Sequence, residues 1–289
     1  MCQFSPVFIM NKFVLSLNSY HGFTTDQSLE GAAAAGFLFI EPCAVEGWTE
    51  NVLPDMNQSE LDRIKKKMAA LNLLPVGLSG HCNLLDEKRL NDFRKKILLA
   101  AELGCAFIIT SAGEAHFGKD EQFTCDALAE NIKSLLPDLK KAGLILGLEV
   151  HGDVYGTGSS LRPVIEKVAS SLVGVCYDTG NAMYYGGQKC TEEIKTCIDI
   201  VKYVHLKDAV GGQKEWNFPA TGKGNLHLET FMDYMESNGY TGPYSVEIEY
   251  TEEFTMNPKK PGDLEIANQA AKDSFAFLKN SRSRSKRGK

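Results

Sequence analysis

The sequence contains no CxxC pair, although it has eight cysteines in 289 residues. The cysteines show no regular spacing, and Cys105 and Cys176 lie inside apolar runs, where a reduced cysteine behaves as a small hydrophobic residue. Disulfide frameworks and thiolate zinc sites usually have paired or regularly spaced cysteines. We therefore expect a reducing, cytoplasmic setting and no thiolate-bound zinc.

Long apolar segments and an excess of positive charge are also missing. No run of about 18 apolar residues is present to cross a membrane, and we expect no signal peptide at the N-terminus. The net charge is −6, although five basic residues lie in the last eight positions. Because an acidic body is a poor partner for a phosphate backbone, we predict neither a nucleic-acid nor a membrane partner. Residues 281–289 are interpreted as a disordered basic tail.

A glycine-rich phosphate loop is missing too, and this bears on the fold. The first strand-like run ends in SLNSYHG, which does not match the GxGxxG pattern that usually follows the first strand of an open doubly wound sheet. No internal repeat or low-complexity linker divides the chain into two domains. The candidates are therefore those folds that alternate strands and helices within one domain.

Strand-like runs alternate strictly with helical patterns along the chain. The runs lie at residues 12–20, 37–42, 74–81, 105–113, 144–150, 173–178, 203–208 and 244–250. The helical patterns lie at 26–35, 59–72, 86–104, 123–143, 160–171, 189–199, 225–238 and 263–279. Alternation of this kind requires a parallel sheet, and eight units close a barrel. We predict an α/β protein with a single (β/α)₈ TIM barrel over residues 1–280.

The last four strand-like runs each carry an ionisable side chain at or near the C-terminal end. These residues are Glu149, Asp178, His205 and Glu247. Such barrels have their active sites at this end of the strands, and a carboxylate buried there alone would be costly. A set of carboxylate oxygens and an imidazole suits a divalent ion such as Mn²⁺, Mg²⁺ or Co²⁺. The sequence therefore predicts one divalent metal ion, with Mn²⁺ the first choice.

Other polar residues near the strand ends are candidates for substrate contacts. His81 and His151 suit sugar hydroxyls or a phosphate, with loop hydrogen bonding as the alternative. Glu41 ends the second run and suits either a substrate contact or a salt bridge. Lys207 follows His205 by two positions and therefore points to the same side. We predict a substrate contact for each, and for Lys207 also a role in supporting the metal ligand.

Glu249 lies two positions after Glu247 in the last strand-like run. Both side chains are expected on one face of the strand. Glu249 is therefore the alternative to Glu247 as the ligand that this strand supplies.

Four segments resemble the xylose-isomerase-like barrels of the sugar isomerase/epimerase superfamily. They are LEVHGD, VCYDTGNA, YVHLKDA and GYTGPYSVEIEY, and the resemblance extends over residues 12–278. That superfamily includes ketose 3-epimerases, hydroxypyruvate isomerase, inosose dehydratase and endonuclease IV. The resemblance implies that Glu149, Asp178, His205 and Glu247 are the metal ligands. It also implies that Glu149 and Glu247 form the acid/base pair.

The chemistry of these residue types agrees with that implication. A divalent ion chelated by the carbonyl and a neighbouring hydroxyl of a ketose acidifies the adjacent C–H and stabilises an enediolate. One carboxylate removes the proton, and its return on the other face or at the neighbouring carbon gives epimerisation or aldose–ketose isomerisation. We predict a metal-dependent isomerase of a small-molecule sugar or sugar phosphate. A lyase or dehydratase of keto-sugars or keto-inositols, and a non-catalytic sugar-binding barrel, remain open, as does homo-oligomerisation.

Two departures from the 3-epimerases affect the substrate contacts. Many of those enzymes have a histidine where this chain has Asn181, for which we predict a substrate contact. They also use an arginine after the histidine ligand, where residues 209–224 offer only Lys214 and Lys223. Endonuclease IV requires further histidine and aspartate ligands that this chain does not supply at the matching positions, which argues against DNA repair.

Overall fold

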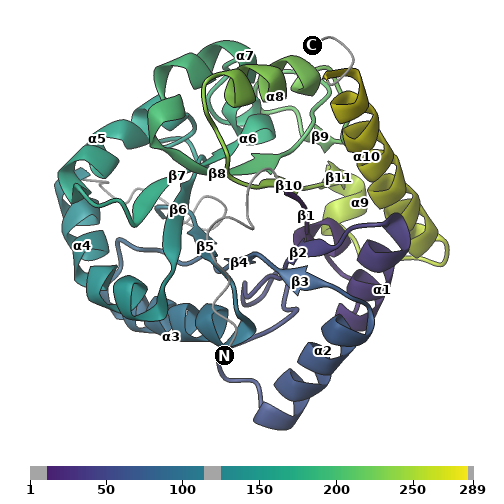
Figure 1. Ribbon diagram of the computed structural model, residues 1–289, viewed down its shortest axis with the longest axis horizontal. Coiled ribbons are helices and arrows are strands. Elements are labelled where there is room, and N and C mark those ends of the chain that lie inside the picture. Colours follow the sequence, from purple (N-terminus) through teal and green to yellow (C-terminus); the bar gives the residue numbers. More distant parts are fainter. Residues whose placement is uncertain (1–11, 114–124, 286–289) are drawn as a thin grey trace.

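The computed structural model describes residues 12–113 and 125–285. Among these residues, nine parallel strands form one sheet in the order β3-β2-β1-β10-β8-β7-β6-β5-β4. The strands are β1 (Phe13–Ser16), β2 (Phe39–Glu41), β3 (Leu74–Pro75), β4 (Gly77–Ser79), β5 (Phe107–Thr110), β6 (Ile145–Glu149), β7 (Val173–Asp178), β8 (Val201–Leu206) and β10 (Tyr244–Val246). Figure 1 shows them as a ring surrounded by helices.

The ring closes at the third predicted strand, which is divided into β3 and β4 on either side of Val76. The Val76 amide donates to the Ile40 carbonyl at 2.9 Å, and the Val76 carbonyl accepts from the Ala106 amide at 2.9 Å. One continuous segment therefore joins β2 to β5. The predicted single (β/α)₈ barrel is confirmed, with this segment as its third strand.

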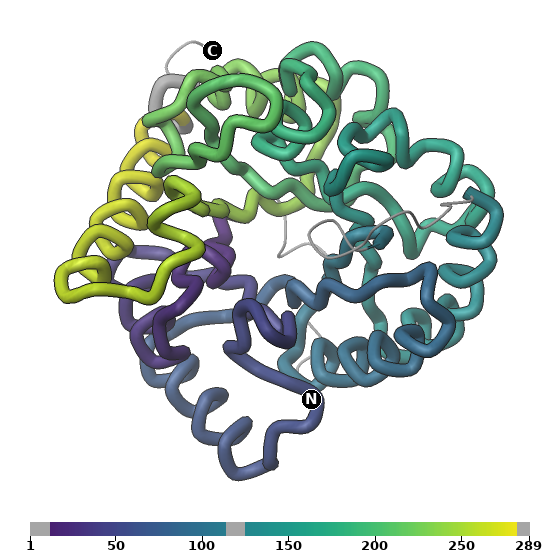
Figure 2. Tube along the Cα trace, turned by 180° about the vertical axis from the view of Figure 1, so that it is seen from behind, coloured from purple at the N-terminus to yellow at the C-terminus, as the bar shows by residue number. Residues whose placement is uncertain are grey.

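Helices cover the outside of the barrel. The long ones are α1 (Thr25–Ala35), α2 (Gln58–Ala70), α3 (Glu87–Leu103), α4 (Cys125–Ala142), α5 (Gly158–Val168), α8 (Leu228–Ser237) and α10 (Asp263–Ser285). A capping box between Thr24 and Gln27 starts α1, and Gly36 ends it in the left-handed conformation at φ +98°. Figure 2 shows α1 and α10 side by side, an approach that Gly31 permits because a Cβ there would clash with Tyr20 and Asn268.

Some predicted boundaries are wrong. Residues 17–20, predicted as strand, form the 3₁₀ helix η2 (Leu17–Tyr20). The predicted helix 189–199 is instead α7 (Cys190–Glu193) followed by two 3₁₀ turns, η3 (Ile194–Thr196) and η4 (Ile198–Ile200). The last helix continues to Ser285 and so covers the start of the predicted tail, while residues 286–289 lie outside the described part. None of the described helices is long and apolar enough to span a membrane.

Residues alternate between the interior and the exterior of the barrel. The interior has an apolar layer formed by Val14, Val76, Phe107, Ile109, Cys176 and Tyr203. Two positions further along β7 and β8 stand Asp178 and His205, which share that inward face because the strand period is two. The ionisable residues therefore lie directly above this layer, at the C-terminal end.

The segments after β8 and β10 are tied together at the same end of the barrel. Strand β9 (Asn217–Phe218) pairs with β11 (Tyr250–Thr251), which is followed by α9 (Glu252–Met256). The buried Asp208 carboxylate accepts hydrogen bonds from the amides of Ala209, Gly222, Gly224 and Leu226. This single side chain fixes both ends of the segment 209–226.

Candidate metal centre

The four predicted metal ligands converge on one point. Their donor atoms all lie within 4.8 Å of one another. The exposed fractions are 2% for Glu149, 0% for Asp178, 0% for His205 and 5% for Glu247. Parallel register brings them together, since Glu149 pairs with Cys176 and Asp178 pairs with His205 on neighbouring strands.

The His205 ring is oriented by two carboxylates. Its Nδ1 lies 2.5 Å from Glu149 Oε1, and its Nε2 lies 3.0 Å from Glu41 Oε1. Glu41 also accepts a hydrogen bond of 2.8 Å from the Tyr203 hydroxyl. Nδ1 therefore faces the cluster, while Glu41 supports the ring from behind, an arrangement typical of metal-binding histidines.

Lys207 is the cation nearest to the cluster in the described chain. Its Nζ lies 2.8 Å from Glu247 Oε2, 3.1 Å from Asp178 Oδ2 and 3.0 Å from Glu249 Oε2. It also donates to Asn181 Oδ1 at 3.3 Å. Because Lys207 is only 2% exposed, these acidic groups provide most of its stabilisation.

The donor set fits a divalent cation. Asp178 Oδ2 and Glu247 Oε2 are buried and accept no directed hydrogen bond, although the Lys207 ammonium is close to both. Lone pairs of this kind, together with an imidazole nitrogen, are ligands that Mn²⁺ or Mg²⁺ takes. Glu149, Asp178, His205 and Glu247 would hold the ion.

The close packing of acidic groups in the cluster shifts the pKa values of Asp178 and His205. Burial, reinforced by Glu247 and Glu149 and opposed by Lys207, raises the pKa of Asp178 to about 8. Burial disfavours a charged His205, but the surrounding acidic groups outweigh it and raise its pKa well above the ordinary value. A metal ion must therefore displace a proton from His205, which makes binding pH-dependent.

A cavity opens beside the cluster and contains most of the predicted substrate contacts. It is lined by Asn18, Val45, Glu46, Trp48, Ser79, His81, Cys82, Arg89, Ser111, Gly113, Glu149, His151, Asn181, Lys207, Glu247 and Glu249. His81, His151, Asn181 and Lys207 are thus in the lining. Glu41 is not, because it is fully buried beneath His205.

Asn18 is a site residue that sequence reasoning missed. Its Nδ2 donates to Glu247 Oε1 at 3.0 Å and to Glu249 Oε1 at 3.1 Å. Its Oδ1 accepts from the Trp48 indole at 2.9 Å. Asn18 thereby bridges the two glutamates of the last strand, of which only Glu247 belongs to the donor cluster. Its position near the end of the first predicted strand was the available signal.

His21 lies behind this wall of the cavity, where its ring stacks on Trp48 with centroids 3.9 Å apart. Burial and the nearby Lys259 lower the pKa of His21 to about 4. Between pH 6.5 and 4 the unfolded chain therefore binds more protons here than the folded one. We therefore expect the free energy of unfolding to decrease as the pH is lowered from 6.5 to 4. Urea denaturation at several pH values measures this decrease.

A variant without the imidazole separates the contribution of His21 from that of the other titrating groups. His21→Gln should show a flatter dependence on pH than the wild type, because glutamine cannot be protonated in this range. Equal slopes for His21→Gln and the wild type would contradict the expectation.

The fold and the donor cluster define a class, and comparison with known proteins agrees. The family model of the xylose isomerase-like TIM barrel matches residues 29–281. The chain therefore belongs to this family, which confirms the resemblance drawn from the sequence. A xylose isomerase-like TIM barrel protein from Mycobacterium smegmatis, in complex with magnesium, has a TM-score of 0.74 at 16% identity, covering 96% of this chain and 99% of that one.

Particular relatives fall into two groups. A D-allulose 3-epimerase from Methylomonas sp., solved with D-allulose, has a TM-score of 0.73 at 16% identity, covering 94% of this chain and 98% of that one. At such identities the likeness shows the fold alone. By sequence, the chain is 27% identical to an inosose dehydratase from Geobacillus kaustophilus, covering 71% of this chain and 68% of that protein. A second inosose dehydratase, from Clostridium perfringens, is 27% identical, but the match covers 50% of this chain and only 52% of that protein.

Proposed function

We propose that this chain is a divalent-metal-dependent isomerase or epimerase of a small sugar or sugar phosphate. The observation that supports it most is the convergence of three carboxylates and one imidazole beside a cavity rich in hydrogen-bonding groups. A divalent ion held there would polarise a substrate carbonyl and acidify the neighbouring C–H. Mn²⁺ is the proposed ion, and the free cysteines of the described residues favour a cytoplasmic setting.

Glu149 and Glu247 are the proposed acid/base pair. They come from β6 and from the end of β10, which stand three positions apart in the sheet order. Two carboxylates so placed approach a substrate from different sides. Glu149 removes the proton from one face, and Glu247 returns a proton to the other, or to the neighbouring carbon in an isomerisation.

The remaining polar groups of the cavity are proposed to position the substrate. His81 and His151 stand on one side of Glu149, while Lys207 and Asn181 stand near Asp178. Asn181 is pinned, because its amide nitrogen donates to the Val150 carbonyl at 3.0 Å. Its side-chain carbonyl oxygen is therefore fixed, and it accepts a hydrogen bond from Lys207. Many 3-epimerases have a titratable histidine at this position.

A dehydratase is the second candidate, because the relatives named above by sequence are inosose dehydratases. The same proton abstraction next to a carbonyl would then be followed by expulsion of a β-hydroxyl group. The Lys207 ammonium would supply the proton for the departing hydroxide.

Incubation of the Mn²⁺-loaded protein with a panel of ketoses and keto-inositols in D₂O tests both candidates. Deuterium exchange with formation of an epimer or aldose supports the isomerase. An unsaturated ketone identifies the dehydratase. No exchange with any substrate, in a protein of verified metal content, would overturn the proposal and leave a sugar-binding barrel.

We further propose that Glu41 acts through His205 rather than on the substrate. Glu41→Gln should weaken Mn²⁺ binding by about 10–100-fold, since loss of the carboxylate behind a ligating histidine has effects of that size. Isothermal titration of Mn²⁺ into the metal-free protein measures this directly. As a control, Tyr203→Phe removes only the hydroxyl that donates to Glu41 and should have a smaller effect. Unchanged Mn²⁺ affinity in Glu41→Gln would show that Glu41 does not support metal binding through His205.

A further inference from the structure

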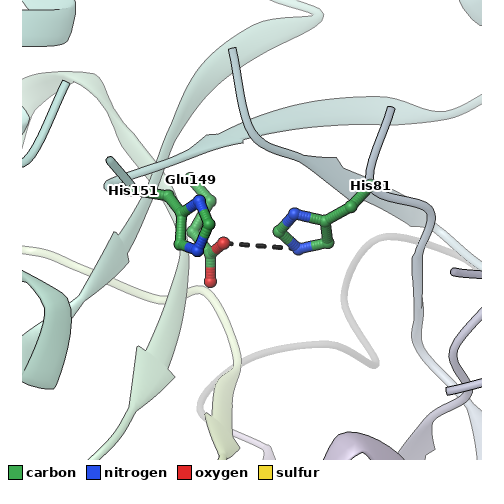
Figure 3. A group of neighbouring side chains, drawn as sticks. All are labelled: His81, Glu149 and His151. Atoms are coloured by element: carbon green, nitrogen blue, oxygen red, sulfur yellow. Dashed lines mark ion pairs between the residues drawn. The ribbon is translucent and has the colours of Figure 1, made fainter. Parts of the chain in front are cut away.

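The two carboxylates of the proposed acid/base pair have different supports. Glu149 is a paired residue of β6, and its Oε2 lies 3.3 Å from His81 Nε2, as Figure 3 shows. Glu247 lies one residue past Val246, the last paired residue of β10, and its amide nitrogen is 3.4 Å from the Leu206 carbonyl. The sheet therefore fixes Glu247 less firmly than Glu149, so the Glu247 side chain depends more on contacts from outside the sheet.

Asn18 supplies such a contact, and its amide has only one possible orientation. Its Oδ1 accepts hydrogen bonds from the Trp48 indole and the Thr49 hydroxyl, each at 2.9 Å. Because an indole N–H can only donate, the atom that it meets must be the amide oxygen. The amide nitrogen then faces the glutamates and donates to Oε1 of Glu247 at 3.0 Å and to Oε1 of Glu249 at 3.1 Å. Both donors and both acceptor positions of the Asn18 amide are thus used.

The 3₁₀ helix η2, which carries Asn18, is fixed to the same segment by two further hydrogen bonds. The Ile248 amide donates to the Ser19 hydroxyl at 3.0 Å, and the Tyr250 hydroxyl donates to the Ser19 carbonyl at 3.0 Å. Ser19 and Ile248 are both buried. These bonds hold η2 against the residues that follow Glu247, so Asn18 meets the Glu247 carboxylate at a set position.

We propose that Asn18 is a positioning residue that holds the Glu247 carboxylate in place for proton transfer, a role that rests on the proposed function. Oε2 of Glu247 lies 2.8 Å from Lys207 Nζ and 3.8 Å from His205 Nδ1, on the side of the metal donors. Oε1 faces Asn18, and both residues line the cavity.

The hydrogen bond from Asn18 leaves the carboxylate free to act. A carboxylate oxygen has two lone pairs, so Oε1 of Glu247 accepts the bond from Asn18 with one and keeps the other for a proton. When Glu247 acts as the base, the proton of the substrate C–H goes to Oε1, and the electron pair of that bond stays on the substrate. Asn18 thus fixes the rotation of the carboxylate without competing for the ion at Oε2.

Asn18→Ala should slow deuterium exchange by about 10–100-fold, since misplacing a reacting group by about 1 Å can cost 100-fold. The substrate is the ketose or keto-inositol of the panel above that the wild type exchanges fastest, and the rate is followed by NMR at saturating Mn²⁺. The loss should appear in kcat, whereas KM and the Mn²⁺ affinity from isothermal titration should stay near their wild-type values. In an epimerase the loss should fall on the epimer that Glu247→Gln blocks, because Glu149 has its own support.

A double variant separates positioning from a general structural role. In the Glu247→Gln background, Asn18→Ala should have little further effect, because residues that act as a unit are not additive. Thr49→Val removes one of the two donors that orient Asn18 and should give a smaller loss of the same kind, which also tests the role if Asn18→Ala does not fold. Asn91→Ala, on the surface, is the matched control and should exchange at the wild-type rate.

Three results would overturn the positioning role. They are a wild-type rate in Asn18→Ala, equal losses for both epimers, and losses that multiply in the double variant. Failure of the proposed function would look different, because the wild type itself would then show no exchange with any substrate, and the role of Asn18 would fall with it.

Discussion

Replacing Glu149 or Glu247 with glutamine should lower the rate of deuterium exchange into the substrate by about 10²–10⁴-fold, the usual effect of losing a general base. Glutamine keeps an amide oxygen for the metal ion, so part of the metal affinity should survive. The rate is measured by NMR at saturating Mn²⁺, which separates proton transfer from ligation. In an epimerase the two variants should differ by substrate, since each blocks proton removal from one epimer.

Glu249→Gln is the matched control, because Glu249 lies two positions further along the same segment. It contacts Lys207 at 3.0 Å and Asn18 at 3.1 Å, but it is outside the cluster of metal donors. We expect a smaller loss of rate than in Glu247→Gln. Normal exchange in Glu247→Gln together with an inactive Glu249→Gln would show that Glu249 is the base on this strand.

Replacing Lys207 with methionine should lower the free energy of unfolding of the metal-free protein by about 3–5 kcal/mol. Removal of one partner from a buried ion-pair network leaves uncompensated charges, and losses of that size are typical. Here the acidic groups that lose their cationic partner are Asp178, Glu247 and Glu249. Urea denaturation in the presence of chelator measures the loss. Mn²⁺ should recover part of it, because an ion that binds only the folded state stabilises that state.

Lys223→Met is the control for this variant. Its side chain is 62% exposed, and its ammonium lies 3.6 Å from Asp273. A surface pair of this kind contributes only about 0–1 kcal/mol. Equal stability of Lys207→Met and Lys223→Met would mean that Lys207 is not needed to balance the acidic cluster.

The barrel and the convergence of the four donor side chains were predictable because both follow from the ends of strands. An apolar run that stops at Glu149 or Asp178 marks the rim of a parallel barrel, and the inward side of each strand is then fixed by a period of two. The same rule brought His205 into the cluster. No pairing information was needed, since a closed barrel brings all its strand ends to one side.

The support behind the cluster could not be predicted in the same way. The contacts of Glu41 with His205 and Tyr203 join residues more than 160 positions apart across the barrel interior. Asn18 was passed over because the η2 turn, which follows β1, directs its side chain to the last strand. Such partners depend on the tilt and register of strands, which local patterns do not specify.

The segment 209–226 shows where this barrel can accept extra residues. Asp208 holds both of its ends, and the Val210 amide bonds to the Asn217 carbonyl at 2.9 Å, so the exposed tip between them begins and ends at fixed points. Lengthening a loop whose ends are already fixed costs little entropy, about 0.6 kcal/mol per doubling of its length. Substitutions and insertions at residues 211–215 should therefore leave the barrel and its donor cluster undisturbed.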